Sequence, residues 1–388
     1  MIFNRKFRRW AWLLIVWVVL MPADTLGEPG KPVLFSYFKV YDWDIDFIAD
    51  RYEMVVWHNH PRSVKNLPVL RQKNPQIKAL LYRELFCILR EETQLAESVG
   101  HYDWIMEHHP NWFQKDIRGN LIEVPEYPGR FMMDLGNEQW RDFWIKETMK
   151  DVKEGGWDGV FVDDALTSVK MHHLPRLRNY PTDANLQAAV YGFLKKAYEA
   201  FHAEGKLMLA NVSNSYDYPG LFAQWLDVTD GIMEEHCSGS SWTWGPHVGE
   251  AQLQAMQTAR KADKWYLCMT YGLWEDQSLM DLSFSTYLMG LSNKVAWSYR
   301  SEGAHSKRVP VDPVWIDEIG LPTSDPKNAG AVWLREFEGG TIFLNPTRSF
   351  QAVEYFDEQY MIAPRSFRKF IQNSPLEGKQ NVPTLPEL

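Results

Sequence analysis

The stretch GWDGVFVDDA, residues 156–165, decides the fold class of this chain. A short apolar run begins at glycines and finishes abruptly in two carboxylates, Asp163 and Asp164. Such runs are typical of strands that are buried on both faces of a parallel sheet. In that interpretation the strand delivers an acid to the edge of the sheet. The alternative is a strand that leads into a helix, with Asp164 as the helix N-cap.

Eight apolar runs of this kind alternate with helical patterns, which predicts a (β/α)8 TIM barrel in the α/β class. The predicted strands cover residues 32–39, 52–58, 76–84, 159–164, 206–213, 230–236, 265–272 and 294–300. Helices are predicted over 138–153, 183–204, 249–262 and 278–292. Asn137 precedes the first of these helices, Asp183 can cap the second, and Gly205 can end it.

The predicted barrel covers residues 28–310 and has two additions. Its third connection, residues 85–136, is far longer than ordinary βα loops and is interpreted as a small sub-domain that roofs one side of a cleft. Residues 325–388 are predicted to form a small antiparallel β unit and a tail. Its strands would cover 331–337, 341–346 and 352–356, and a short helix would follow Pro364.

The first 27 residues have the pattern of a signal peptide, with a basic start and a dozen apolar residues. An uncleaved membrane anchor is the alternative. We expect export to the periplasm or the exterior and no membrane association after cleavage. Removal of residues 1–27 changes the formal net charge from −9 to −12, which disfavours nucleic acid as a partner and is compatible with neutral substrates.

The three cysteines, Cys87, Cys237 and Cys268, leave at least one free thiol because their number is odd. All three are interpreted as small buried hydrophobic residues. The histidine pairs lack a third convergent ligand, so no metal is expected. No glycine-rich nucleotide motif is present, and no cofactor is expected.

Two of the predicted strands can be aligned by a glycine, and each then offers a carboxylate at the same position. Asp163 and Glu235 both lie four residues past that glycine, on strands four and six. Because side chains alternate along a strand, Phe161 shares a face with Asp163, and Met233 shares a face with Glu235. Two carboxylates that flank a bond are the apparatus of glycoside hydrolysis. A one-residue slip would select Asp164 and Glu234 instead.

Polar and aromatic side chains at the other strand ends and in the adjacent loops fit a sugar-binding site. Flat aromatic faces stack on sugar rings, although core packing explains most of the 18 tryptophans. The predicted substrate-binding residues are Tyr37, His58, Arg83, Glu84, Asn211, Asn214, His236, Trp242, Trp244, Tyr271, Trp274, Tyr299 and Arg300.

Residues 134–137, 157–164 and 231–235 resemble motifs of glycoside-hydrolase-like TIM barrels, in particular hypothetical glycosyl hydrolase family 15. Residues 333–346 are similar to the β unit that closes such proteins. The resemblance implies Asp163 as nucleophile and Glu235, or Glu234, as acid/base. It implies no particular substrate.

Three hypotheses for the function of the protein follow. Each has an extracellular or periplasmic polysaccharide or oligosaccharide as the substrate or ligand. The first is a retaining glycoside hydrolase, in which Asp163 is the ionised nucleophile and Glu235 is the general acid. The second is an inverting hydrolase with a wider carboxyl separation. The third is a non-catalytic carbohydrate-binding barrel that serves polysaccharide export or processing.

Overall fold

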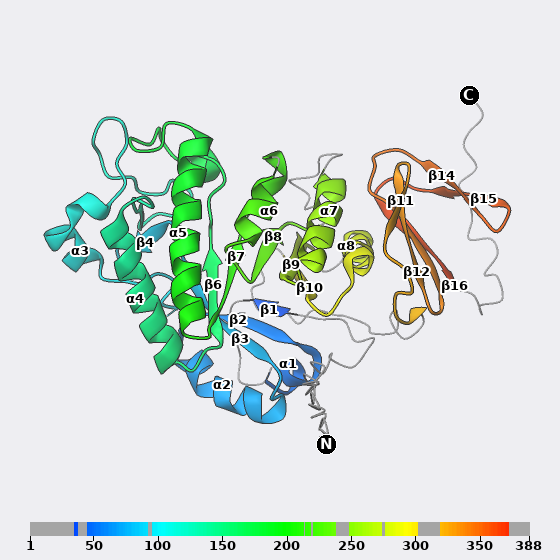
Figure 1. Ribbon diagram of the computed structural model, residues 1–388, viewed down its shortest axis with the longest axis horizontal. Helices are drawn as coiled ribbons and strands as arrows, with labels where there is room; N and C mark the ends of the chain where they lie inside the picture. Colours follow the sequence, from blue (N-terminus) through cyan, green and yellow to red (C-terminus); the bar gives the residue numbers. More distant parts are fainter. Residues whose placement is uncertain are drawn as a thin grey trace, which may run out of the picture.

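An eight-stranded parallel sheet forms the centre of the molecule and curls around its own axis (Figure 1). The computed structural model describes residues 35–37, 45–91, 95–212, 214–218, 220–237, 248–273, 276–301 and 319–371. The strands follow one another in chain order: β1 Phe35–Tyr37, β2 Met54–Trp57, β3 Lys78–Glu84, β6 Gly159–Asp163, β7 Leu207–Asn211, β8 Gly231–Glu235, β9 Trp265–Gly272 and β10 Val295–Ser301. Seven lie within predicted segments and β10 extends one residue beyond the last of them, so a parallel α/β sheet is confirmed.

Strands β1 and β10, at the two ends of the sheet, contact each other. Within the described ranges, however, no hydrogen-bonded ladder joins them, and complete closure into a (β/α)8 barrel stays a prediction. The inner face of the sheet is lined by a compact apolar cluster. It consists of Met54, Val56, Leu80, Tyr82, Phe161, Leu209, Met233, Leu267, Met269 and Ala296.

Two glycines explain the strand register at the centre of this sheet. A Cβ atom on Gly159 would collide with the backbone of Leu207, and one on Gly231 would collide with Trp265. Glycine therefore permits the neighbouring strand to approach closely at both positions. The register places Phe161 and Met233 on the inner face, as predicted. Because side chains alternate along a strand, Asp163 and Glu235, two residues further on, point to the same face.

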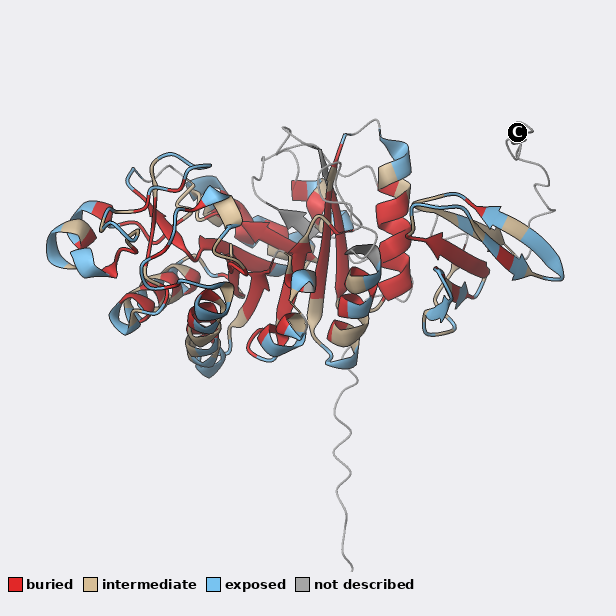
Figure 2. Ribbon diagram, turned by 90° about the horizontal axis from the view of Figure 1, so that it is seen from above, coloured by how far each residue is buried: buried red, intermediate tan, exposed pale blue. Residues whose placement is uncertain are grey.

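Helices cover the outer face of the sheet, whose strands are buried on both sides (Figure 2). Their bounds are α1 Ile45–Arg51, α2 Pro61–Lys73, α4 Glu138–Glu154, α5 Asp183–Ala203, α6 Leu221–Leu226, α7 Val248–Lys261 and α8 Gln277–Gly290. Asn137 caps α4, as predicted. The prediction that Asp183 caps α5 was wrong, because Thr182 accepts the cap bond from the Asn185 amide while Asp183 accepts from Ser168.

The long connection between β3 and α4 has secondary structure of its own. It contains β4 Cys87–Leu89, α3 Tyr102–His108, the 3-10 turn η2 Pro110–Trp112, and β5 Arg130–Met132, which pairs antiparallel with β4. The backbone amide of Leu85 donates to the carbonyl oxygen of Asp163, at 3.2 Å. The connection is thereby anchored beside the carboxyl end of β6.

A C-terminal unit of antiparallel strands packs beside α8 (Figure 1). Its strands are β11 Lys327–Ala329, β12 Val332–Phe337, β13 Gly340–Asn345 and β16 Ser366–Ile371, with a hairpin of β14 Gln351–Tyr355 and β15 Glu358–Ile362. The predicted pairing of 331–337 with 341–346 is confirmed. The short helix predicted after Pro364 was wrong, because this segment pairs with β13 as β16.

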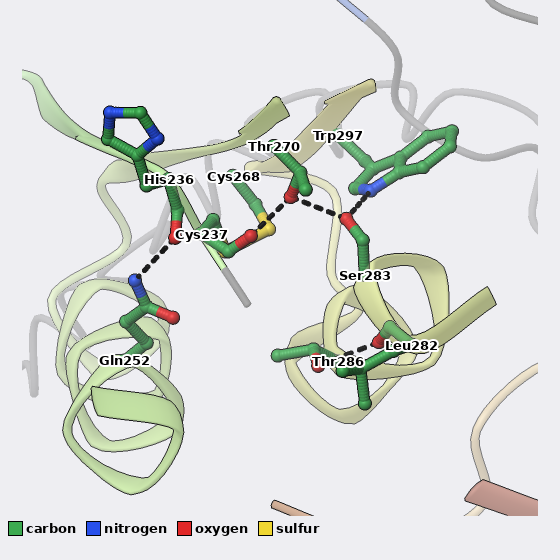
Figure 3. The surroundings of a disulfide bond; sticks show 9 residues. All are labelled: His236, Cys237, Gln252, Cys268, Thr270, Leu282, Ser283, Thr286 and Trp297. Carbon is green, nitrogen blue, oxygen red and sulfur yellow. Dashed lines mark hydrogen bonds between the residues drawn. A yellow bond between two sulfur atoms is a disulfide. The ribbon is translucent and has the colours of Figure 1, made fainter. Parts of the chain in front are cut away.

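Two of the three cysteines form a disulfide, Cys237–Cys268, which joins the end of β8 to β9 (Figure 3). The interpretation of all three as small hydrophobic residues was therefore wrong for this pair. The two cysteines were not recognisable as partners because strand neighbours are separated by 31 residues in sequence. Cys87 is buried with a free thiol, in agreement with the prediction of at least one.

Candidate active site

Asp163 and Glu235 lie at the carboxyl ends of β6 and β8, and Asn211 lies between them at the end of β7. The Asn211 side-chain nitrogen donates to Asp163 Oδ1 at 2.8 Å and to Glu235 Oε2 at 3.0 Å. All three side chains therefore project from the inner face, at the edge where parallel sheets of this class carry their functional groups.

The shared amide limits how far apart the two carboxyl groups lie. Both accepting oxygens are within 3.0 Å of one nitrogen, so they are no more than about 6 Å apart. With the two N–H bonds of an amide roughly 120° apart, their separation is about 5 Å. For comparison, retaining glycosidases have carboxyl groups about 5–5.5 Å apart and inverting enzymes about 6.5–9.5 Å.

A tyrosine holds each of these carboxylates. The Tyr82 hydroxyl, on β3, donates to Asp163 Oδ2, and the Tyr271 hydroxyl, on β9, donates to Glu235 Oε1 at 2.6 Å. His236 packs against Tyr271 with ring centroids 5.0 Å apart. With the Asn211 bonds, each carboxylate is oriented by two donors from neighbouring strands, which fixes its position for chemistry.

Burial and neighbouring charge both act on Asp163, which is 8% exposed. Burial, and then the charges of Asp164 and Glu235, raise the pKa of Asp163 to about 7, while the bonds from Tyr82 and Asn211 act in the opposite direction. Ionisation of Asp163, which the sequence analysis expects, is therefore opposed by burial and by its neighbours and favoured by its two hydrogen-bond donors.

Glu84 completes a tight group of carboxylates with Asp163 and Asp164, whose oxygens lie within 4.8 Å of one another. Burial, and then the charges of Asp164 and Asp163, raise the pKa of Glu84 well above its ordinary value. Arg130, from the long connection, donates to Glu84 Oε2 at 3.1 Å and to Glu97 at 2.7 Å. Such a group could hold a cation by its spacing, but Arg130 already supplies positive charge, and we assign no metal ligand.

Asp164 adopts a left-handed backbone conformation, with φ of 53°, and no helix follows it directly. The alternative role as a helix N-cap was therefore wrong. Its Oδ1 lies 3.3 Å from Nε2 of His172, in the 3-10 turn η3 Met171–His173. Asp164 stands beside the pair formed by Asp163 and Glu235 rather than replacing a member of it.

Four predicted site residues have no accessible polar group facing the site. Arg83 projects outward to Asp151 of α4, and Glu234 projects outward to Ser215 in the 3-10 turn η4 Ser215–Asp217. Tyr299 is 1% exposed and donates to the Leu273 carbonyl oxygen. Glu84 faces inward but is fully buried under the long connection. Arg83, Glu234 and Tyr299 point away from the site because side chains alternate along a strand. Nearness to a strand end does not determine the face of the sheet on which a side chain lies.

The remaining predictions divide by location. His58 is buried beside Tyr82, with ring centroids 4.6 Å apart, and its Nε2 lies 3.6 Å from Glu97. Asn214 occupies a left-handed turn before η4. The signal peptide, Trp242, Trp244, Trp274 and the side chains of Tyr37 and Arg300 lie outside the described residues.

Three site residues were missed by the sequence analysis. Tyr82 has the parity of Leu80 on β3, so alternation could have placed it on the inner face. Arg130 and His172 come from long connections, and no spacing rule links them to the strand ends. No signal in the sequence could have identified these two.

The fold and the paired acids define a glycoside-hydrolase-like α/β protein. Residues 71–341, more than half of the chain, match hypothetical glycosyl hydrolase family 15, and the chain belongs to that family. The predicted family resemblance is confirmed. The protein is a glycosidase by family, and membership leaves its activity unspecified.

Solved structures with a similar fold include other glycoside hydrolases. The glycoside hydrolase domain of PelA from Pseudomonas aeruginosa shares 13% identity over 72% of this chain and 97% of its own, with a TM-score of 0.48. The GH31 dextranase of Flavobacterium johnsoniae shares 12% identity over 89% of this chain and 52% of its own, with a TM-score of 0.49. At these scores the likenesses carry no argument about substrate. No curated protein matches the chain.

Proposed function

We propose that this protein is a retaining glycoside hydrolase that cleaves a polysaccharide or oligosaccharide, with Asp163 as nucleophile and Glu235 as acid/base. The observation that carries the proposal is the single Asn211 amide that bridges the two carboxylates and holds their oxygens about 5 Å apart. This spacing favours direct attack on an anomeric carbon over insertion of a water molecule.

In the first step, a carboxylate oxygen of Asp163 bonds to the anomeric carbon as the glycosidic bond breaks. Glu235 gives its proton to the departing oxygen. In the second step, Glu235 takes a proton from water, the water oxygen bonds to the anomeric carbon, and Asp163 is released. Because the nucleophile must be ionised, we expect activity to increase as the pH rises through about 7.

The proposal is tested by incubating the protein with a panel of polysaccharides and measuring new reducing ends. NMR of the first product formed then reports its anomeric configuration, which retention leaves unchanged. Initial inversion would reject the retaining mechanism. Saturable binding without turnover would favour the non-catalytic carbohydrate-binding barrel.

We further propose that the protein is exported and that its signal peptide is cleaved near residue 27. We also propose that residues 28–310 form a closed barrel, followed by the β unit over residues 325–388. The Cys237–Cys268 disulfide supports export, because disulfides persist mainly in oxidising compartments. Contact between β1 and β10 supports closure. None of the described helices is long and apolar enough to span a bilayer. Mass spectrometry of the purified periplasmic or secreted protein tests export and the cleavage position together.

A further inference from the structure

His172 occupies a bridging position between two connections of the fold. Its Nδ1 lies 2.9 Å from Glu126 Oε2, in the long β3–α4 connection, and its Nε2 lies 3.3 Å from Asp164 Oδ1, after β6. The imidazole stacks on Phe86 with ring centroids 5.2 Å apart and nearly parallel planes. Two carboxylates and the rings of Phe86 and Tyr127 therefore surround a single histidine.

The backbone around this contact is unusual at both ends. Asp164, His172 and His173 all have positive φ, between 53° and 54°. Left-handed conformations are uncommon outside glycine, although Asp and His adopt them more often than most residues, and surrounding contacts stabilise them. The bridge supplies such contacts and directs the Asp164 carboxylate toward His172.

We propose that His172 is a positioning residue that compensates the charge of Asp164 and thereby keeps Asp163 able to ionise near neutral pH. The inference rests on the proposed function, in which Asp163 is the nucleophile.

The electrostatics agree with this geometry. Burial lowers the pKa of His172, but its bonds to Asp164 and Glu126 outweigh burial and raise that pKa to about 9, so the ring is a cation at neutral pH. The charge of Asp164 acts in turn to raise the pKa of Asp163. The imidazolium of His172, beside Asp164, opposes this rise in the pKa of Asp163, because it offsets the negative charge of Asp164.

Other titratable and charged groups surround Asp163 and Asp164, and they remain in place when His172 is changed. The strands contribute Tyr82, Glu84 and Glu235, and the long connection contributes Glu126, Tyr127 and Arg130. Arg130 is bonded to Glu84 and Glu97, so it does not replace His172 at Asp164. Loss of the imidazolium would leave Asp164 uncompensated.

The test compares His172→Gln with His173→Gln. His173 is a matched control because it has the same backbone conformation and also contacts Glu126, at 3.1 Å, but its side chain is 82% exposed. We expect His172→Gln to move the acidic limb of the kcat/KM profile upward by about 0.5–1 pH unit, a three- to tenfold loss below that limb. His173→Gln should leave the limb unchanged.

A second measurement needs no turnover. Carboxyl 13C NMR of labelled aspartate follows the ionisation of Asp163 directly, and His172→Gln should raise its midpoint by the same amount. If the midpoint moves but no glycan is cleaved, the positioning role holds and the proposed function fails. An unchanged midpoint, or an equal shift in His173→Gln, overturns the inference. Should His172→Gln not fold, His172→Asn removes the same positive charge with a shorter side chain and should raise the midpoint in the same direction.

Discussion

At the scale of single residues, Asp163 combines burial with dependence on its hydrogen-bond donors. Tyr82 and Asn211 stabilise its ionised form, while burial and two neighbouring carboxylates oppose ionisation. A carboxyl group in this balance is sensitive to the loss of either donor. The two acids that follow each other at the end of β6 therefore have different environments and should respond differently to mutation.

We expect Asp163→Asn to remove nearly all turnover, by several orders of magnitude, because the covalent route is lost. Asp164→Asn is the matched comparison and should retain substantial activity, because Asp164 points to His172. Steady-state kinetics with circular dichroism as a folding control measures both. An active Asp163→Asn with an inactive Asp164→Asn would reverse the assignment.

Glu235→Ala should be severely impaired toward substrates with poor leaving groups but should retain the first step on activated aryl glycosides. A good leaving group needs no protonation, whereas the second step still lacks its base. Azide should then restore turnover by attacking the glycosyl enzyme without base assistance, and the glycosyl azide is detectable by mass spectrometry. Equal loss on both substrate types without rescue would remove Glu235 from the acid/base role.

Glu234 has a different role, which pH-dependent stability can reveal. Burial raises its pKa to about 8 in the folded protein, above the ordinary value near 4.5. At pH values between these two pKa values, Glu234 holds a proton in the folded state that it has lost in the unfolded state. The free energy of unfolding therefore falls as the pH rises through this range. Glu234→Gln cannot ionise and should gain stability relative to wild type, on the order of 2–4 kcal/mol at pH 8.

Urea unfolding at pH 4 and pH 8 measures this effect, with Glu235→Gln as the neighbouring control. The advantage of Glu234→Gln should be absent at pH 4, where both states of the wild type are protonated. An advantage of equal size at the two pH values would show that ionisation of Glu234 is not its cause.

At the scale of elements, alternation along each strand determines which of the predicted site residues face inward. Apolar runs and the glycines at 159 and 231 were sufficient to place the strands and to put Asp163 and Glu235 on one face. Arg83 and Tyr299 lie at the same edge but have the opposite parity. The partners of the acids that come from connections, Arg130 and His172, depend on tertiary packing that no local pattern encodes.

The disulfide between β8 and β9 holds the segment that follows Glu235. Thr270 donates to the Cys237 carbonyl oxygen, and Gln252 donates to that of His236, so the segment is fixed from two sides (Figure 3). Replacing both disulfide cysteines with serine should lower stability by about 2–4 kcal/mol and reduce kcat.

Thermal unfolding with and without dithiothreitol measures the contribution of this disulfide. The wild type and a Cys87→Ala variant should both lose stability on reduction, because Cys87 is a free thiol. The double serine variant should not respond. Reduction without effect on the wild type would show that the bond contributes nothing to the stability of the fold.

At the scale of the whole molecule, α8 joins the parallel sheet to the C-terminal β unit. Residues along its entire circumference are buried, because the sheet covers one side and strands β12, β13 and β16 contact another (Figure 2). Arg335, on β12, is 3% exposed and donates to the carbonyl oxygens of Leu288, Met289 and Leu291, at 3.0–3.1 Å. The Leu288 carbonyl also accepts from the Leu291 amide at 3.3 Å, so the guanidinium adds a second donor there and supplies a donor to the other two carbonyl groups at the end of α8.

Because one guanidinium joins the two parts, we expect a single cooperative unfolding transition in which the sheet and the β unit unfold together. Arg335→Ala should lower the free energy of unfolding by about 2–4 kcal/mol, since the buried carbonyl groups of Met289 and Leu291 lose the guanidinium donor. Arg335→Lys retains the charge but not the planar set of donors, so it should recover only part of that loss. Lys327→Ala removes a more exposed ion pair of β11 and should change stability by less than about 1 kcal/mol. Calorimetry distinguishes the outcomes, and two separate transitions in the wild type would show that the β unit folds independently of α8.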